Sequence, residues 1–227
     1  MARILLGLTG SVASIKAPEL FWTLSRQGHQ VRAVATRHAC HFFDPAALGT
    51  APGSHQAGGI RKPDICTLDE DEWPPGPAAD SRWTRGDEVL HIQLRDWADL
   101  LVIAPLDANT LAKLALGMCD NCLACIWRAW DLSKPRLIAP AMNTRMWEHP
   151  ATGRHLAQLI QDSGHPVPTD LPREETLKLL GHGINGLRMA APEHRKLACG
   201  DEGMGAMASL ETIDKLVQTS LRGFQSI

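Results

Sequence analysis

The feature that most constrains the fold of this chain is a set of short apolar runs, each of which ends in proline or is followed directly by small residues. Three of them are Ile4–Leu8, Leu100–Pro105 and Arg136–Pro140, and the last two both end in Ala-Pro. Short apolar runs of this kind are typical of strands buried on both faces of a sheet. Because segments with helical periodicity separate the runs, the sequence predicts an α/β fold with a mainly parallel sheet covered on both faces.

Helical periodicity is visible in three segments between and after these runs. An apolar face over residues 12–24 predicts a helix that ends near Gly28, and Val31–Ala35 predicts the next strand. Residues 111–118 predict a second helix behind good cap residues, and residues 210–221 predict a helix near the end of the chain.

Two stretches lack this periodicity. Proline and glycine interrupt residues 45–86, which are predicted to be mostly surface loop with a brief strand at Ile65–Leu68. Residues 164–195 are also predicted to be rich in loops. Between the two stretches, Val89–Leu94 is interpreted as an ordered segment beside a strand.

Composition narrows the class of partner. A chain of 227 residues with a hydrophobic fraction of 44% can bury one core, so residues 1–227 are expected to form a single domain. A net charge of -2 disfavours nucleic acid and anionic membranes, and favours a small molecule. The absence of a signal-peptide core and of a spanning segment predicts a cytoplasmic protein whose six cysteines stay reduced.

Parallel sheets bind ligands beyond the carboxyl ends of their strands. This selects four loops in this chain, which are Thr9–Ala13, Thr36–Phe43, Pro105–Thr110 and Pro140–Trp147. In the first, the turn Gly10-Ser11-Val12-Ala13 can aim backbone N–H groups and one hydroxyl at a single phosphate group. The dinucleotide fingerprint G-x-G-x-x-G is absent, so a monophosphate is favoured over a nicotinamide dinucleotide. An ordinary turn in which Ser11 caps a helix is the alternative.

The other motifs are also open to two readings. The loop after Leu100–Pro105, residues 105–110, can bind a planar polar ring or can simply cap a helix. Cys119, Cys122 and Cys125 lack the fourth cysteine of a ferredoxin run, so buried, unreactive thiols are favoured over a metal site.

Two residues are candidates for proton transfer. His91 can act as a base near neutral pH, although one histidine of ten is more often structural. Cys199 lies in a glycine-rich segment, which predicts either a flap that delivers a proton or a turn with an incidental cysteine.

Five segments occur in an order that resembles one known family. They are Thr9–Ala13, His91–Leu94, Ala104–Leu111, Pro140–Trp147 and Ala198–Asp201. This order resembles the homo-oligomeric flavin-containing cysteine decarboxylases, and in particular the phosphopantothenoylcysteine decarboxylases of coenzyme A biosynthesis. Asp107, in place of serine, resembles the animal form.

The resemblance implies a Rossmann-like or flavodoxin-like three-layer sandwich and a homotrimer with active sites between subunits. It implies that FMN is bound by Gly10, Ser11, Val12, Thr36, Phe43, Pro105, Asp107, Ala108, Asn109, Thr110, Ala141 and Met142. The implied catalytic residues are His91, Asn143 and Cys199, and the implied substrate-binding residues are Asn143, Met146, Ala198 and Gly200. No metal is implied.

The implied reaction begins with oxidation of a cysteine-derived thiol to a thioaldehyde by FMN. The thioaldehyde then accepts the electron pair that the departing carboxylate leaves behind. Return of a hydride from the reduced flavin, with a proton from Cys199, would complete a redox-neutral cycle.

Two segments, about 49–62 and 168–193, depart from the family pattern and are interpreted as loop insertions.

Three other functions share parts of the motif set. One is an oxidative decarboxylase of peptides that end in cysteine, and another is a relative that regulates a protein phosphatase. The presence of both His91 and Cys199 and the lack of a long acidic tail disfavour the regulator. A flavin prenyltransferase is disfavoured because it would not require the Cys199 flap.

Overall fold

The computed structural model describes residues 1–49, 62–72, 86, 88–196, 200 and 202–224. Its centre is a six-stranded sheet in the order β3-β2-β1-β4-β5-β6, and every pairing is parallel. The strands are β1 (Arg3–Leu8), β2 (Gln30–Ala35), β3 (Cys66–Leu68), β4 (Leu100–Leu106), β5 (Arg136–Pro140) and β6 (Leu187–Met189). The prediction of a parallel α/β sheet is therefore confirmed.

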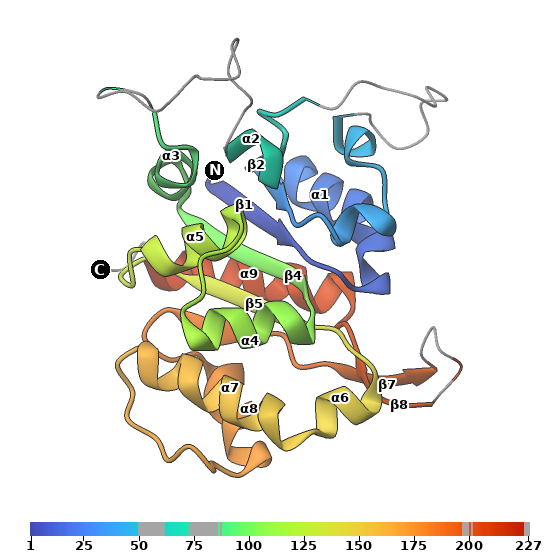
Figure 1. Ribbon diagram of the computed structural model, residues 1–227, viewed down its shortest axis with the longest axis vertical. Helices are drawn as coiled ribbons and strands as arrows, with labels where there is room; N and C mark the ends of the chain where they lie inside the picture. Colours follow the sequence, from blue (N-terminus) through green and yellow to red (C-terminus); the bar gives the residue numbers. More distant parts are fainter. Residues whose placement is uncertain (50–61, 73–85, 87, 197–199, 201, 225–227) are drawn as a thin grey trace.

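Helices cover both faces of this sheet (Figure 1). The α-helices are α1 (Ala17–Arg26), α2 (Asp69–Glu72), α3 (Leu90–Trp97), α4 (Ala108–Leu116), α5 (Cys122–Ala129), α6 (Thr144–Glu148), α7 (Pro150–Asp162), α8 (Arg173–His182) and α9 (Leu210–Phe224). In the loops, the described residues include three short 3₁₀ helices, η1 (Val12–Lys16), η2 (Ala39–His41) and η3 (Pro45–Gly49). A separate antiparallel hairpin joins β7 (Glu193–Lys196) to β8 (Glu202–Ala206).

The two faces of β1 show how the sequence builds three layers. Successive side chains of a strand point to opposite faces. Ile4 and Leu6 accordingly pack in the cluster that contains α1 and α9, whereas Leu5 packs in the cluster that contains α3, α4, α5, α7 and α8. All three side chains are fully buried, which is why the run is continuously apolar.

The predicted helix over residues 12–24 is present in two parts. A 3₁₀ turn, η1, precedes α1, and Pro18 occupies the first turn of α1. A proline is tolerated there because the first N–H groups of a helix have no partner within the helix. The strand predicted at residues 65–68 is confirmed as β3, and the predicted helix near the end of the chain is confirmed as α9.

Two stretches contain elements that the sequence did not predict. Residues 90–94 form part of helix α3, and Leu94 packs in the same core cluster as side chains of β1 and β4, so the segment does lie beside strands. The stretch 164–195 contains loops, as expected, but also α8 and the sheet strand β6. Whether residues 168–193 are an insertion stays a prediction, and residues 50–61 lie outside the described residues. Within the described part of the chain, no helix has the length and apolar character needed to cross a membrane.

Candidate functional site

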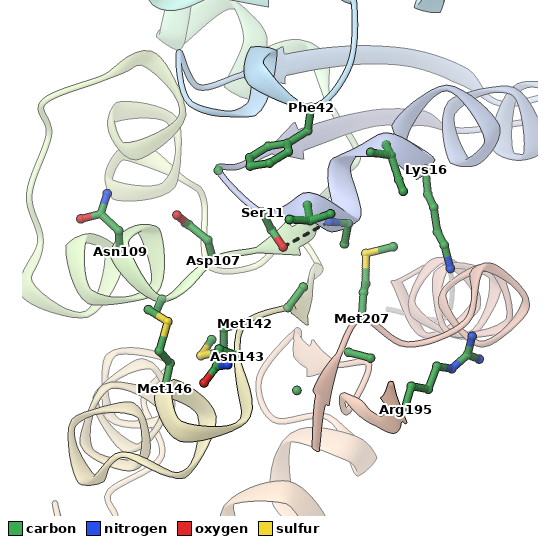
Figure 2. Close-up of a pocket in the computed structure, with 18 residues that line it drawn as sticks. Ser11, Lys16, Phe42, Asp107, Asn109, Met142, Asn143, Met146, Arg195 and Met207 are labelled. Carbon is green, nitrogen blue, oxygen red and sulfur yellow. Dashed lines mark hydrogen bonds between the residues drawn. The ribbon is translucent and has the colours of Figure 1, made fainter. Parts of the chain in front are cut away.

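A cavity of about 520 Å³ lies at the carboxyl ends of β1, β4 and β5 (Figure 2). Three loops and one hairpin form its wall. They contribute residues 10–13, 15 and 16 after β1, residues 107–109 after β4, residues 141–143 and 146 after β5, and Arg195 with residues 205–207 from the hairpin; Phe42 completes the lining. The volume suits a cofactor-sized ligand.

One buried hydroxyl joins the loop after β1 to the loop after β4. Thr9 Oγ1 donates to the carbonyl of Pro105 and accepts the N–H of Asp107, both at 2.8 Å. Thr9 is fully buried, and its own carbonyl accepts the Ser14 hydroxyl. Since every one of these groups is hydrogen-bonded, the two loops are held in a fixed relation at the mouth of the sheet.

The turn after β1 is closed tightly around Gly10. Ser11 N donates to Thr9 O at 2.7 Å, and the Ser11 hydroxyl accepts the N–H of Ala13 at 3.3 Å as the N-cap of η1. A Cβ on Gly10 would lie 2.8 Å from the Cβ of His38 and 3.3 Å from a carboxylate oxygen of Asp107. Any larger residue would therefore push the turn away from the neighbouring loops.

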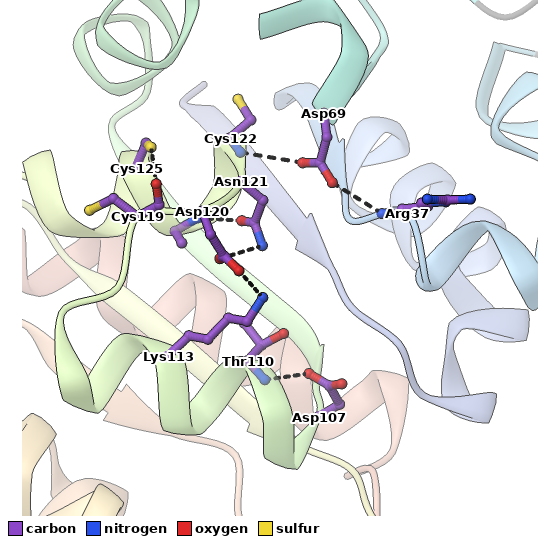
Figure 3. Close-up of polar contacts among 11 residues, drawn as sticks. Arg37, Asp69, Asp107, Thr110, Lys113, Cys119, Asp120, Asn121, Cys122 and Cys125 are labelled. Atoms are coloured by element: carbon purple, nitrogen blue, oxygen red, sulfur yellow. Dashed lines mark hydrogen bonds and ion pairs between the residues drawn. The ribbon is translucent and has the colours of Figure 1, made fainter.

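The loop after β4 presents the start of α4 to the cavity. Asp107 is the N-cap, and its Oδ1 accepts the N–H of Thr110 at 2.9 Å (Figure 3). The cap interpretation of this motif is therefore correct. It is also compatible with ligand binding, because Asp107, Ala108 and Asn109 line the cavity.

The hairpin forms the side of the cavity opposite these loops. Met142 N donates to the carbonyl of Gly205 at 2.9 Å, which ties β8 to the loop after β5. Gly205 has a φ of 132°, and a Cβ there would collide with the Met142 carbonyl. The close approach of the two backbones therefore requires glycine at this position.

Two cationic side chains line the cavity beside the hairpin. Arg195 pairs with Glu193, whose other oxygen accepts the N–H of Ser209 at 2.7 Å. Although burial acts to raise the pKa of Glu193, its hydrogen bonds with Ser209 and Arg195 hold that pKa below its ordinary value, and Lys16 adds to the effect. This part of the wall therefore carries a net positive charge.

Most of the predicted site residues lie at one place. The structure brings together Gly10, Ser11, Val12, Asp107, Ala108, Asn109, Ala141, Met142, Asn143 and Met146 as lining residues. Thr36, Pro105 and Thr110 lie beside the cavity loops without lining it. Phe43 packs in the core, and the neighbouring Phe42 lines the cavity instead.

The predicted proton-transfer residues are placed differently. His91 is in the first turn of α3, hydrogen-bonded to Glu72, and is not part of the lining. Gly200 is exposed between β7 and β8. Ala198 and Cys199 lie outside the described residues.

Sequence reasoning missed the hairpin wall. Arg195, Ala206 and Met207 line the cavity, as do Ile15 and Lys16 of η1. Lys16 was detectable as a cation five residues after Ser11. The hairpin residues carry no periodic signal, because their role depends on a contact with the loop after β5 that is distant in sequence.

The three clustered cysteines lie around the start of α5 (Figure 3). Cys122 is buried, and burial raises the pKa of its thiol, with a further contribution from Glu72. Burial also raises the pKa of Cys125 to about 11. Cys119 is exposed, so the prediction of burial is wrong for that residue. The described residues hold no group of three or more histidine, cysteine or acidic side chains placed to bind a metal ion.

The residues that line the cavity, together with one buried hydroxyl beside it, fit a flavin monophosphate. Thr36 follows β2, and its buried hydroxyl has no hydrogen-bond partner among the described residues. Such a hydroxyl, near the Ser11 turn at the same edge of the sheet, is suited to a phosphate oxygen. An aromatic ring can pack against the apolar side chains of Val12, Ile15 and Met142, which line the cavity.

Comparisons with known proteins point to one group of enzymes. Phosphopantothenoylcysteine decarboxylase of Oryza sativa subsp. japonica is 45% identical over 221 residues, which cover 97% of this chain and 81% of the relative. The mouse protein of the same name is 42% identical over 227 residues, covering 99% and 90%.

Solved structures agree with these relatives. A PPC decarboxylase with a cysteine-to-serine substitution, complexed with pantothenoylaminoethenethiol, is 41% identical, has a TM-score of 0.73, and covers 97% of this chain and 98% of its own. The FMN binding protein AtHal3 is 42% identical, with a TM-score of 0.68 and coverage of 96% and 95%. The predicted flavodoxin-like, Rossmann-like fold is therefore confirmed. Because the Flavoprotein family model matches residues 1–222, nearly the whole length of this sequence, the chain belongs to the Flavoprotein family.

Proposed function

We propose that this chain is an FMN-dependent phosphopantothenoylcysteine decarboxylase of coenzyme A biosynthesis. One observation carries the proposal. The loops that match the family motifs converge on a single cavity, in a chain more than 40% identical to enzymes with that activity. The product is 4'-phosphopantetheine, and carbon dioxide is released.

The phosphate of FMN is assigned to the turn after β1 with the Thr36 hydroxyl. Its ring is assigned to the loops after β4 and β5, with Val12 and Ile15 of η1 packed against it. When bound, FMN would supply a reversible acceptor for two electrons. Oxidation of the thiol-bearing carbon would then let the carboxylate on the neighbouring carbon leave as carbon dioxide. The chain's own residues then have three tasks: to bind the substrate carboxylate, to exclude water and to move protons.

Asn143 is assigned to the substrate carboxylate. It is the N-cap of α6, and its Oδ1 accepts the N–H of Arg145 at 2.8 Å. The oxygen end of the amide is therefore engaged with backbone, and the Nδ2 end is the one suited to donate to a carboxylate. Met146 lies on the next turn and covers the same part of the cavity with an apolar side chain (Figure 2).

The two proton-transfer roles go to His91, which does not line the cavity, and to Cys199, which lies outside the described residues. His91 is assigned as the base in the oxidation half of the reaction. Cys199 is assigned as the proton donor in the reduction half, with Ala198 and Gly200 beside it at the substrate. The β7–β8 hairpin supports the second assignment, because it forms a cavity wall and residues 197–201 join its strands.

The proposal includes a homotrimer in the cytoplasm with active sites between subunits. The position of His91 supports shared sites, since α3 packs on α5 while the cavity lies beyond β1, β4 and β5. A base that acts at this cavity then comes most simply from a neighbouring copy of the chain.

A second substrate class shares the same chemistry. The FMN-dependent cysteine decarboxylase SpaF is 26% identical to this chain with a TM-score of 0.63, so a peptide ending in cysteine is the competing substrate. The end group attached to the cysteine distinguishes the two enzymes.

The test is to incubate the purified holoprotein with phosphopantothenoylcysteine and, separately, with a peptide ending in cysteine. Mass detection follows both products, and visible absorbance follows the flavin. We expect 4'-phosphopantetheine with no net change in flavin colour. Turnover of the peptide alone would contradict the proposed substrate.

Cys199→Ser is expected to stop at the decarboxylated, unsaturated thiol, and His91→Asn is expected to fail before any decarboxylation.

A further inference from the structure

A buried carboxylate holds His91 in one orientation. Glu72 Oε1 lies 2.5 Å from His91 Nδ1, and Glu72 Oε2 accepts the backbone N–H of His91 at 3.1 Å. The Glu72 side chain is 2% exposed and that of His91 is 20% exposed. The two oxygens of one carboxylate therefore fix both the backbone and the ring of the same residue.

A third group also faces this carboxylate. The Cys122 thiol, at the start of α5, hydrogen-bonds to Glu72, and this contact helps to raise the pKa of Cys122. Glu72 thus accepts from α3 and from α5. The carboxylate therefore bridges the two helices as a hydrogen-bond acceptor.

The arrangement determines which ring nitrogen exchanges protons. An ionised carboxylate at Nδ1 requires a hydrogen on that nitrogen, whether the imidazole is neutral or protonated. In the neutral ring the lone pair then lies on Nε2. Nε2 is therefore the atom that can take a proton from a partner outside the chain.

The pair lies at the ligand-binding edge of the sheet. Glu72 ends α2, which follows directly after the carboxyl end of β3. Asp69, in the first turn of α2, accepts the N–H of Arg37 beyond β2 and the N–H of Cys122 (Figure 3). These contacts connect the segment that supports His91 to the loop after β2 and to the start of α5.

We propose that Glu72 is a positioning residue that fixes the Nδ1–H tautomer of His91 and so makes Nε2 the proton acceptor of the reaction. This inference rests on the proposed function. In the oxidation half, the thiol S–H bond breaks and its proton goes to His91 Nε2. The electron pair of that bond forms the carbon–sulfur double bond, while a hydride leaves the adjacent carbon for the oxidised flavin.

The structural alternative is a pair that only ties α2 to α3. Both accounts predict some loss of stability when Glu72 is changed. They differ in the tautomer of His91 and in the step that slows, and both can be measured directly.

The first experiment needs no variant at Glu72. Histidine labelled with ¹⁵N is introduced into the holoprotein, and His91→Gln identifies the His91 signals. We expect the neutral ring to carry its proton on Nδ1. A neutral ring with its proton on Nε2 would overturn the proposal, whatever the activity of the protein.

The second experiment compares Glu72→Gln with Glu70→Gln in rapid-mixing measurements of flavin reduction by phosphopantothenoylcysteine. The amide that Glu72→Gln introduces can donate to Nδ1 and so favours the unproductive tautomer. We expect flavin reduction to slow by about 10²- to 10⁴-fold, the range for loss of a general base or its tautomer, with little change in KM. Glu70, a neighbouring acid without this contact, is the matched control.

The outcomes separate the two proposals. If the unsubstituted protein does not decarboxylate the substrate, the proposed function fails while the tautomer is still measured. If it does, but a folded Glu72→Gln protein reduces its flavin at the rate of the Glu70→Gln control, the positioning role of Glu72 is rejected.

Discussion

Thr9 shows how one small side chain organises the site. Its hydroxyl donates to the loop after β4 through Pro105 and accepts from the same loop through Asp107. The side chain is fully buried, so water cannot replace it. The loop that is assigned to the phosphate and the loop that is assigned to the ring are thus held by a single atom.

Replacing Thr9 with valine keeps the shape and removes both hydrogen bonds. We expect Thr9→Val to lower the free energy of unfolding by about 2–4 kcal/mol, because a carbonyl and an N–H are left without partners. Urea unfolding measures the loss. Thr23→Val, which removes a hydroxyl from the partly exposed surface of α1, is the control and should change stability little. Equal effects of the two substitutions would contradict the role of Thr9.

At the scale of elements, the site depends on where helices and strands begin. α4 starts at Asp107, and the same residue lines the cavity. The Lys113–Asp120 ion pair closes the loop after α4 at a more exposed position. The cap at the start of α4 can therefore be compared with an ion pair between α4 and the loop after it.

Asp107→Ala should cost about 1 kcal/mol, because it removes the acceptor for the N–H of Thr110. Asp107→Ser should be nearly neutral, since a hydroxyl can cap the same helix and serine is the other residue seen in the family pattern. Asp120→Ala should change stability by less than Asp107→Ala, since exposed ion pairs contribute little. Thermal unfolding compares the three, and a serine variant as unstable as the alanine variant would argue against a capping role.

The stability that the contact between the hairpin and the start of α9 contributes should depend on pH. The pKa of Glu193 is lower in the folded protein than its ordinary value, so its ionised form stabilises the fold. That contribution is complete above the ordinary carboxyl pKa and is lost as pH falls through the folded pKa. Glu193→Gln should therefore have a flatter acid limb in urea unfolding at a series of pH values. An acid limb identical to that of the unsubstituted chain would contradict this account.

Elements with a strong local sequence pattern could be predicted, and elements that depend on contacts with residues distant in sequence could not. The continuous apolar runs predicted β1, β4 and β5 because both faces of these strands are buried. α3 was missed because His91, Gln93 and Arg95 alternate with apolar residues as in a strand. The segment is nevertheless a helix, and Leu94 is the residue of it that packs in the core. α8 was missed because only Thr176 and Leu180 of its ten residues are buried.

The same distinction, between local sequence motifs and contacts that form only on folding, applies to the candidate site. The loops at the ends of β1, β4 and β5 have short motifs whose positions follow from the sheet, so they could be predicted. The hairpin wall and the Glu72–His91 pair depend on segments that meet only after folding. No local pattern identifies them.

At the scale of the whole molecule, the central proposal is that one chain does not complete an active site. His91 lies on α3, away from the cavity that Asn143 lines. If sites are shared, the two residues of one working site come from different subunits of the proposed trimer.

Mixing two inactive variants tests this arrangement. We expect His91→Asn and Asn143→Ala to be inactive separately and, after joint refolding or co-expression, to recover about a quarter of full activity, since a random mixture pairs the two intact residues at that frequency. Light scattering on the same samples reports the number of subunits. Recovery of no activity from confirmed mixed oligomers would show that each chain supplies both residues to its own site.

The measurement that tests the account most directly is a titration of the FMN-free protein with FMN, followed by flavin absorbance and fluorescence. We predict one FMN per chain, and loss of binding in Gly10→Ala, where a Cβ would meet His38 and Asp107. Gly153→Ala, in α7 where a Cβ meets nothing, should bind normally. A correctly folded protein that takes up no FMN, or a Gly10→Ala variant that binds as tightly as the Gly153→Ala control, would contradict the assignment of this cavity.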